Sequence, residues 1–363
     1  MPSDFMLLEL FRLDATMACA AALGVCLLIL WTRPWHGSFS MDDVIGVQKM
    51  HAAPTPRIGG VAIAFGVLVG FAASSQDLAA SEKRHILSTI ILAGIPAFVF
   101  GLLEDLTKRV SVRARLLATM ASGLLGWGIT GVSVSAVAIP GIDWLLGFTA
   151  VSVLFTAFAV GGMANAVNII DGFNGLAAGA VLIMLGAFGL VARSVDDIPL
   201  AFSCLVLAGA VLGFLLVNWP LGKIFLGDGG AYFLGFALAW ISVLLPHRNP
   251  TISPWTSLLI LAYPVLEVVF SYLRRVRRNS HPGQPDRMHL HHLLHTRVAR
   301  KLLPELPQRL QNGLTSSMIW ALIAVPSGLA ILTAARPRWA LVAMGLSAVM
   351  YGALYRRLAR FRW

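Results

Sequence analysis

The sequence predicts an all-α, polytopic integral membrane protein with about eleven transmembrane helices. Hydrophobic residues make up 57% of the 363 residues and charged residues only 12%, about half the share that soluble domains carry. Apolar runs long enough to cross a bilayer recur along nearly the whole chain. These runs are continuous instead of alternating, which argues against a transmembrane β-barrel.

We expect the whole chain, 1–363, to form a single transmembrane domain. The predicted apolar cores are 13–32, 58–75, 86–103, 116–135, 147–168, 175–192, 199–217, 229–246, 254–272, 315–334 and 338–355. The one long connection, 273–313, joins the cores 254–272 and 315–334 and is a basic segment that contains four prolines. The residues before the first core carry several acids and few basic residues, whereas a signal peptide begins with a positively charged region. We therefore expect that the first core is not cleaved off.

The basic residues predict how the chain is oriented in the membrane. The net charge is +11, and most of the 28 Lys and Arg residues fall on alternate loops, including 273–313 and the C-terminal tail. The positive-inside rule then places the N-terminus outside, and the C-terminus and these loops in the cytoplasm. Because topology and lipid contact account for the positive charge, we expect no nucleic-acid partner.

Five polar stretches interrupt the apolar pattern, and all five fall at the predicted cytoplasmic side. They are QKMHAAPTPRIGG (48–60), GLLEDLTKRVSVRAR (101–115), NAVNIIDGFNGLAAG (165–179), NWPLGKIFLGDGGAYFLG (218–235) and DRMHLHHLLHTR (286–297). The topology was deduced from Lys and Arg alone. The location of all five polar stretches on one side is therefore an observation that the deduction did not assume. We therefore expect five distant segments to assemble one site at the membrane–cytosol boundary. Short polar turns on the other side, such as SVDDIP, receive no chemical role.

Four acids in these stretches lie next to hydrocarbon: Glu104, Asp105, Asp171 and Asp228. Charges at such positions rarely face lipid and usually mark function. Neighbouring carboxylates repel one another unless a cation lies among them, and oxygen ligands suit Mg²⁺ or Mn²⁺. For any single acid, helix capping is an equally good explanation, and Asp228 could cap the helix that begins GGAYFLGF. For all four on one face, the pattern favours a metal site.

Basic side chains flank the acids, and a metal together with basic groups suits a pyrophosphate. Lys108 lies three residues past Asp105, so a helical continuation would put both on one face. We favour functional roles for Lys49 and Lys108. For Arg113 and Arg115 we expect ordinary positive-inside anchors.

The histidines of HLHH form the last cluster, with His289, His291 and His292 followed one turn later by His295. Two interpretations stay open: a zinc site, or hydrogen bonding to a phosphate or nucleotide. No cysteine accompanies the cluster, and its spacing differs from a helical H-E-x-x-H motif.

Together these stretches resemble the polyprenyl-phosphate N-acetylhexosamine-1-phosphate transferases, glycosyltransferase family 4. The matching pieces, in family order from about residue 45 to 295, are KMHAAPTPRIGG, GLLEDL, NAVNIIDGFNGLAAG, FLGDGGAYFLGF and HLHH. PTPRIGG is more similar to the branch that starts O-antigen and teichoic-acid linkage synthesis than to the peptidoglycan translocase.

The resemblance implies a bacterial inner-membrane enzyme with its site facing the cytoplasm. It would transfer a sugar-1-phosphate from a UDP-N-acetylhexosamine, such as UDP-GlcNAc, to undecaprenyl phosphate. The products would be undecaprenyl-diphospho-sugar and UMP, the first step of a cell-surface glycan such as O-antigen or capsule. The implied cofactor is Mg²⁺, with Mn²⁺ as the alternative, and a homodimer is left open.

The resemblance also assigns roles by position. Catalytic roles fall on Glu104, Asp105, Asp171 and Lys108, metal ligation on Asp228 and Asp171, and substrate binding on Lys49, His51, Arg57, Asn165, Asn168, Asn174, His289, His291 and His292. Asp105 is the expected base or acceptor-positioning group. The chain departs from the family at Glu104, where the first paired acid is usually Asp, and at Asn174, where many bacterial members have Asp. An asparagine keeps an oxygen ligand but cannot act as a general base.

Two other functions fit parts of the pattern. A secondary transporter also has intramembrane acids and broken helices, but its polar residues lie near the bilayer midplane. A non-catalytic membrane component of a glycan-assembly system would tolerate the departures at Glu104 and Asn174.

Overall fold

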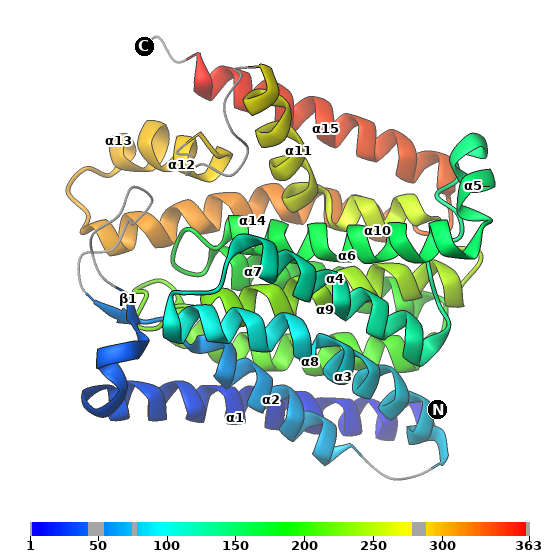
Figure 1. Cartoon of the computed structure of the whole chain (residues 1–363), viewed down its shortest axis with the longest axis horizontal. Coiled ribbons are helices and arrows are strands. Elements are labelled where there is room, and N and C mark those ends of the chain that lie inside the picture. The colour runs from blue at the N-terminus through cyan, green and yellow to red at the C-terminus, as the bar shows by residue number, and fades with distance from the viewer. Residues whose placement is uncertain (1, 43–53, 75–77, 278–287, 361–363) are drawn as a thin grey trace.

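A computed structural model describes residues 2–42, 54–74, 78–277 and 288–360, and this part of the chain is predominantly helical (Figure 1). Lys49 and His51 lie outside the described residues. The elements are α1 (Pro2–Ser40), β1 (Met41–Asp42), β2 (Thr55–Pro56), α2 (Gly59–Ala73), α3 (Leu78–Thr107), α4 (Val112–Thr130), α5 (Pro140–Leu146), α6 (Thr149–Ile170), α7 (Leu176–Ser194), α8 (Ile198–Asn218), α9 (Gly227–Arg248), α10 (Pro254–Ile260), α11 (Ala262–Arg277), α12 (Leu290–Leu294), a π-helical turn (His295–Ala299), α13 (Arg300–Leu302), α14 (Gln308–Thr333) and α15 (Pro337–Ala359). The all-α class predicted from the sequence is confirmed.

Among the described residues, seven helices are long and apolar enough to cross a membrane. They are Leu13–Gly37, Ser81–Thr107, Thr149–Ile170, Leu176–Ser194, Ile198–Asn218, Gly227–Arg248 and Gln308–Thr333. The bent pair α10 and α11 would make an eighth if it counts as one span. The remaining predicted cores coincide with α2, α4 and α15. A multi-pass membrane protein follows, while eleven spans and their orientation stay predictions.

Helix α9 occupies the centre of the bundle. Nearly all its residues from Gly227 to Leu245 are buried, and it packs against α3 and α6 and also contacts α2, α4 and α7. On the outside, α1 packs against α2 and α8. Gly209 and Gly213 of α8 lie against the α1 backbone at Ala15 and Cys19, where a Cβ would collide. Small residues permit this close approach, which is how helices associate in lipid.

The predicted core 254–272 is not one straight helix, because the chain bends by 79° between α10 and α11. Pro264 lies just after the bend. Its ring clashes with the carbonyl four residues earlier, at Ile260, and it has no N–H to continue the helical pattern. Figure 1 shows α11 turning away from the direction of α10. The bend carries the second half of this segment towards α6, α14 and α15.

The segment 273–313, which we expected to be a loop, contains several helical parts among its described residues. α11 continues to Arg277, α12 and the π-helical turn follow from Leu290, and α14 begins at Gln308. Leu290, Leu293 and Leu294 are all buried. Apolar side chains at this spacing share one helical face, so burying that face against the bundle favours helix over loop.

A polar cluster closes the end of the bundle where α7 joins α8. Asp197 is 6% exposed and accepts the Leu200 N–H at 3.2 Å, which caps α8. It also accepts Arg248 Nε at 2.8 Å and Asn249 Nδ2 at 2.9 Å. Arg248 Nη2 donates to Glu82 of α3 at 2.8 Å. The SVDDIP turn is therefore a structural joint and not merely a solvated turn.

Candidate active site

Asp105 lies near the end of α3 and is buried, with 1% of its surface exposed. Its two oxygens accept backbone N–H groups at the start of α9, Oδ1 from Asp228 and Oδ2 from Gly229, each at 2.9 Å. Gly227 has φ +75° and a Cβ there would collide with the Asp105 carboxylate, so this turn requires glycine. Asp105 thus ties the GLLEDL and FLGDGG stretches together.

The PTPRIGG stretch is held in an extended form between two other segments. On one side β2 pairs with β1, and the Arg57 N–H donates to the Ser40 carbonyl at 3.0 Å. On the other side the Phe225 N–H donates to the Pro56 carbonyl at 2.8 Å. This clamp fixes the backbone of Arg57 next to the start of α9.

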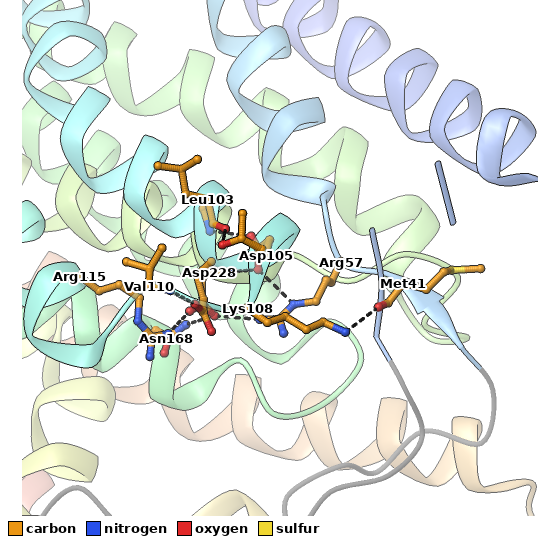
Figure 2. Close-up of polar contacts among 12 residues, drawn as sticks. Met41, Arg57, Leu103, Asp105, Lys108, Val110, Arg115, Asn168 and Asp228 are labelled. Carbon is orange, nitrogen blue, oxygen red and sulfur yellow. Dashed lines mark hydrogen bonds and ion pairs between the residues drawn. The ribbon is translucent and has the colours of Figure 1, made fainter. Parts of the chain in front are cut away.

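Asp228 is the point where several segments meet (Figure 2). Its Oδ1 accepts Arg57 Nη2 at 3.2 Å and Asn168 Nδ2 at 3.0 Å. Its Oδ2 accepts Arg115 Nη1 from α4. Arg57 also reaches Asp105, with Nε 3.0 Å from Oδ1. The structure therefore brings four of the five polar stretches to one end of the bundle.

Glu104 and Lys108, which are close to Asp105 in the sequence, make their hydrogen bonds outside the acid cluster. Glu104 Oε2 accepts the Val110 N–H at 2.8 Å, so this carboxylate closes the α3–α4 turn. Lys108 has φ +55°, and its N–H donates to the Glu104 carbonyl in a left-handed helix end. The expected helical continuation through Lys108 is therefore wrong. Its Nζ donates to the Met41 carbonyl at 3.3 Å, at the edge of β1.

Asp171 follows the last residue of α6 and is half-buried. Burial, and then the negative charge of Asp228, raise the pKa of the Asp171 carboxyl to about 7, while Arg57 acts in the opposite direction. No hydrogen bond or ion pair reaches this carboxylate from the residues that the structure describes. Burial and the nearby charge of Asp228 therefore disfavour the ionised form of Asp171 in its described surroundings.

Asp171 and Asp228 fit a divalent cation. A cation near two carboxylates relieves their repulsion, and carboxylate oxygens suit Mg²⁺. Within the described ranges no group of three or more His, Cys, Asp or Glu residues is arranged to hold a metal, the histidines included. Mg²⁺ is commonly bound by one or two carboxylates together with waters and substrate phosphates, so two acids would suffice on the protein side. The zinc interpretation of the histidines gains no support.

The asparagines of the central stretch serve different places. Asn168 donates to Asp228, whereas Asn165 Nδ2 donates to the Gly161 carbonyl of its own helix at 2.8 Å. Asn165 also lies 3.5 Å from Thr119 Oγ1 of α4. The structure brings Asn168 into the acid cluster, and it directs Asn165 towards α4.

Asn174 faces away from the acids and joins three segments. Its Nδ2 donates to the carbonyls of Pro220, at 3.0 Å, and Arg309, at 3.3 Å. Its own carbonyl accepts Ser316 Oγ of α14 at 2.7 Å. A carboxylate has no donor for the two carbonyls, so the departure at this position suits the surroundings of the side chain.

The histidine motif lies against the loop that follows α6. The ring of Phe173 is 5.7 Å from that of His291, 5.4 Å from His292 and 5.0 Å from His295. A Cβ on Gly172 would sit 3.3 Å from His291 Nε2. Burial and the neighbouring histidines lower the pKa of His291 well below its usual value, and burial lowers that of His295 to about 4. The fifth polar stretch thus adjoins Asp171.

Two charged residues at the site were not predicted from the sequence. Arg115 was expected to be a membrane anchor, but its guanidinium pairs with Asp228. Glu267 of α11 is fully buried, and its Oε1 lies 2.9 Å from His289 Nδ1. Glu267 shows the same signal as the other acids, a carboxylate inside the apolar run LAYPVLEVV. No comparable signal distinguishes Arg115 from Arg113.

Comparisons with known proteins agree with this arrangement. Residues 87–246 match the family model described as glycosyl transferase family 4. An undecaprenyl-phosphate alpha-N-acetylglucosaminyl 1-phosphate transferase of Yersinia pestis is 27% identical over 335 residues, 88% of this chain and 86% of the relative. Its counterpart in Escherichia coli O157:H7 is 26% identical over 355 residues, 93% and 91% of the two chains. A probable undecaprenyl-phosphate N-acetylglucosaminyl 1-phosphate transferase of Bacillus subtilis (strain 168) is 30% identical over 248 residues, which cover 68% of this chain and 67% of the relative. The chain therefore belongs to glycosyl transferase family 4, among the polyprenyl-phosphate hexosamine-1-phosphate transferases.

Proposed function

We propose that this protein transfers N-acetylglucosamine 1-phosphate, or that of a closely related N-acetylhexosamine, from a UDP-sugar to undecaprenyl phosphate. The names of relatives that align over most of both chains support this reaction. The observation that carries the proposal is the cluster in which Arg57 and Arg115 meet Asp105 and Asp228 beside Asp171. Acids for a metal and guanidinium groups for phosphate oxygens stand together there.

The reaction is an in-line displacement at phosphorus. An oxygen of the lipid phosphate attacks the β-phosphorus of the UDP-sugar, and the bond to the bridging oxygen breaks. UMP leaves with that electron pair. A phosphomonoester has a second pKa near 6, so the acceptor is largely ionised at pH 7 and needs little help from a base.

Asp105 then acts as a positioning group and not as a base. Its oxygens already accept two backbone N–H groups and Arg57 Nε. Removing these contacts would release both the α9 turn that presents Asp228 and the guanidinium that bridges the two acids. The same contacts hold Asp228 next to Asn168 and Arg115.

The main barrier is the approach of one anion to another, and the cationic groups offset it. Asp171 and Asp228 would hold Mg²⁺, which supplies positive charge to the reacting phosphates and to departing UMP. Arg57 and Arg115 present planar guanidinium forks that match phosphate oxygens. The histidine motif next to Phe173 would receive the nucleotide sugar.

The site is proposed to face the cytoplasm of a bacterial inner membrane. The alternating distribution of Lys and Arg supports this orientation. UDP-sugars would then reach the site from the cytosol, and undecaprenyl phosphate would arrive from the inner leaflet. The product would start assembly of a cell-surface glycan.

A transfer assay tests the proposal. Purified protein in nanodiscs is supplied with undecaprenyl phosphate, Mg²⁺ and UDP-GlcNAc labelled in the sugar, and lipid-linked label and UMP are measured. We expect equal amounts of both products. UDP-GalNAc in parallel reports the choice of sugar, and a reaction without the lipid is the control.

Absence of lipid-linked label with every UDP-N-acetylhexosamine tested would refute the transferase. The transporter alternative makes a different prediction, namely labelled solute inside proteoliposomes without any lipid-linked product.

A further inference from the structure

Glu267 is a fully buried carboxylate on α11, the part of the chain that follows the bend. Its Oε1 lies 2.9 Å from His289 Nδ1 and accepts the Leu290 N–H at 3.1 Å. Its Oε2 accepts the Tyr351 hydroxyl of α15 at 2.9 Å. One side chain thus connects α11, the start of α12 and α15.

The partners of Glu267 indicate where its proton lies. The Leu290 N–H and the Tyr351 hydroxyl both donate to Glu267, and hydrogen bonds received from donors favour the charged form of a carboxylate. A proton must also lie between Glu267 Oε1 and His289 Nδ1, because two lone pairs at this distance repel. With the carboxylate ionised, that proton belongs to Nδ1 of His289.

Charge balance supports the same assignment. A buried carboxylate requires a paired charge, and His289 is the ion-pair partner that the described residues provide for Glu267. Arg274, on the same helix, directs its guanidinium to the Met288 carbonyl and the Tyr355 hydroxyl, at 2.9 and 2.6 Å. The bond to Met288 holds the chain just before His289, so α11 contacts both the backbone beside this histidine and its ring.

The ring of His289 then has a defined direction. Nδ1 faces α11, so Nε2 occupies the edge of the imidazole turned away from that helix. The ring lies parallel to that of His291, within 1° and 5.4 Å between centroids. His291 in turn adjoins Gly172 and Phe173, next to Asp171.

We propose that Glu267 is a positioning residue that holds the ring of His289 through Nδ1, so that the Nε2 edge is presented to the diphosphate of the nucleotide sugar. This inference rests on the proposed transferase function. The bend between α10 and α11 then contributes to the site, because it brings Glu267 to the histidines.

Steady-state kinetics of four variants test the proposal. Glu267→Gln keeps the size and removes the charge, Glu267→Asp keeps the charge and shortens the arm, and His289→Gln removes the ring. The matched control, Ser347→Ala on α15, deletes a hydroxyl that bonds the Ala343 carbonyl of its own helix, and it leaves the hydrogen bonds of Glu267 intact. Thermal midpoints of all variants report folding.

We expect Glu267→Gln to raise KM for the UDP-sugar about tenfold or more, because a charge-assisted hydrogen bond is lost. KM for the lipid should stay within about twofold of the parent value. The double variant with His289→Gln should be no worse than His289→Gln alone. Glu267→Asp should recover part of the affinity, and Ser347→Ala should stay within about twofold of the parent. A role in packing alone predicts the reverse order, with Asp worse than Gln.

Nitrogen-15 spectra of histidine-labelled protein give a readout that does not need turnover. We expect a protonated Nδ1 at His289 that changes in Glu267→Gln. Unchanged kinetics in Glu267→Gln, additive losses in the double variant, or an unprotonated Nδ1 would each overturn the proposal. If Glu267→Gln does not fold, the proposal is tested by the kinetics of Glu267→Asp and His289→Gln and by the nitrogen-15 spectrum of the parent protein. Failure of the parent to transfer sugar refutes the proposed function separately, and the spectrum still decides the position of the proton.

Discussion

At the scale of single residues, the acids that look alike in the sequence have different surroundings. Asp105 is saturated by backbone N–H groups and Arg57, whereas Asp171 has no described partner. Asp228 pairs with two guanidinium groups. These differences support the proposed division into a positioning group, Asp105, and two candidate metal ligands, Asp171 and Asp228.

Replacing Asp228 by Asn should abolish most transfer while leaving membrane insertion intact. Asn keeps the shape but removes the charge that would hold Mg²⁺ and pair Arg57 and Arg115, so we expect kcat to fall about 100-fold or more. The transfer assay and membrane fractionation measure the two effects. Asp196→Asn, at an exposed acid paired with Arg193, is the matched control. Near-normal turnover in Asp228→Asn would contradict the metal assignment.

Asn174→Asp should destabilise the protein, although it introduces the acid that the family resemblance implies at this position. The variant loses both amide donors and sets a carboxylate against the carbonyls of Pro220 and Arg309, at a cost of about 1–3 kcal/mol for each buried group left unpaired. A drop of several degrees in thermal midpoint is expected. Ser317→Ala serves as control, because its hydroxyl bonds a carbonyl of its own helix. A thermal midpoint equal to that of the parent would remove Asn174 from this structural role.

His295 should make stability depend on pH. Burial lowers its pKa from 6.5 to about 4, so as pH falls the unfolded chain takes up a proton first. Stability from this group is complete above pH 6.5 and is lost between 6.5 and about 4, roughly 2 kcal/mol from pH 7 to pH 5. Thermal midpoints across this range measure the slope. His295→Gln should flatten it, and exposed His247→Gln should not; equal slopes in all three would argue against a neutral buried His295.

At the scale of elements, helix ends and breaks build the site. The end of α3, the start of α4, the end of α6 and the start of α9 all contribute side chains to the acid cluster. The bend at Pro264 redirects α11, which delivers Glu267 to the histidines. Helix ends suit this purpose because their unpaired backbone groups and flexible turns can approach a ligand.

The joint at Asp197 allows stability to be separated from activity. Asp197→Ala removes the α8 cap and leaves Arg248 without its buried partner, which should cost about 3 kcal/mol. We expect a clear drop in thermal midpoint, with kcat per folded molecule within about twofold, since no residue of the acid cluster is in contact with Asp197. Calorimetry and the transfer assay on the same preparation provide the comparison. A large loss of kcat at full folding would show that the two ends of the bundle are coupled.

At the scale of the whole molecule, the predicted orientation has a direct test. Arg109 is exposed beside the acid cluster, and Asp196 is exposed at the joint that contains Asp197. With Cys19, Cys26 and Cys204 replaced, single cysteines at these positions are treated with an impermeant maleimide in spheroplasts. We expect labelling of Asp196→Cys in intact spheroplasts and of Arg109→Cys only after permeabilisation. The opposite pattern would reverse the orientation and place the site outside.

Much of the site was accessible from the sequence because polar residues inside apolar runs are conspicuous. Asp105, Asp171 and Asp228 lie in the polar stretches singled out from the sequence, as do Arg57, Asn168 and the histidines of HLHH, and the structure places these stretches at one end of the bundle. The failures have physical causes. Lys108 lies past a left-handed helix end, Arg115 became a partner of Asp228 only through the packing of α4, and Asn174 makes its bonds to segments 46 and 135 positions away.

By itself, the sequence determined that this is a helical membrane protein with reactive side chains at the ends of its spans. Hydrocarbon excludes uncompensated polar groups, so their positions in the chain report function directly. Only the tertiary structure decided which carboxylate holds a turn, which pairs with arginine and which stays open. Those differences arise from contacts such as Arg57 with Asp228, 171 positions apart, which depend on how the helices pack and not on any local pattern.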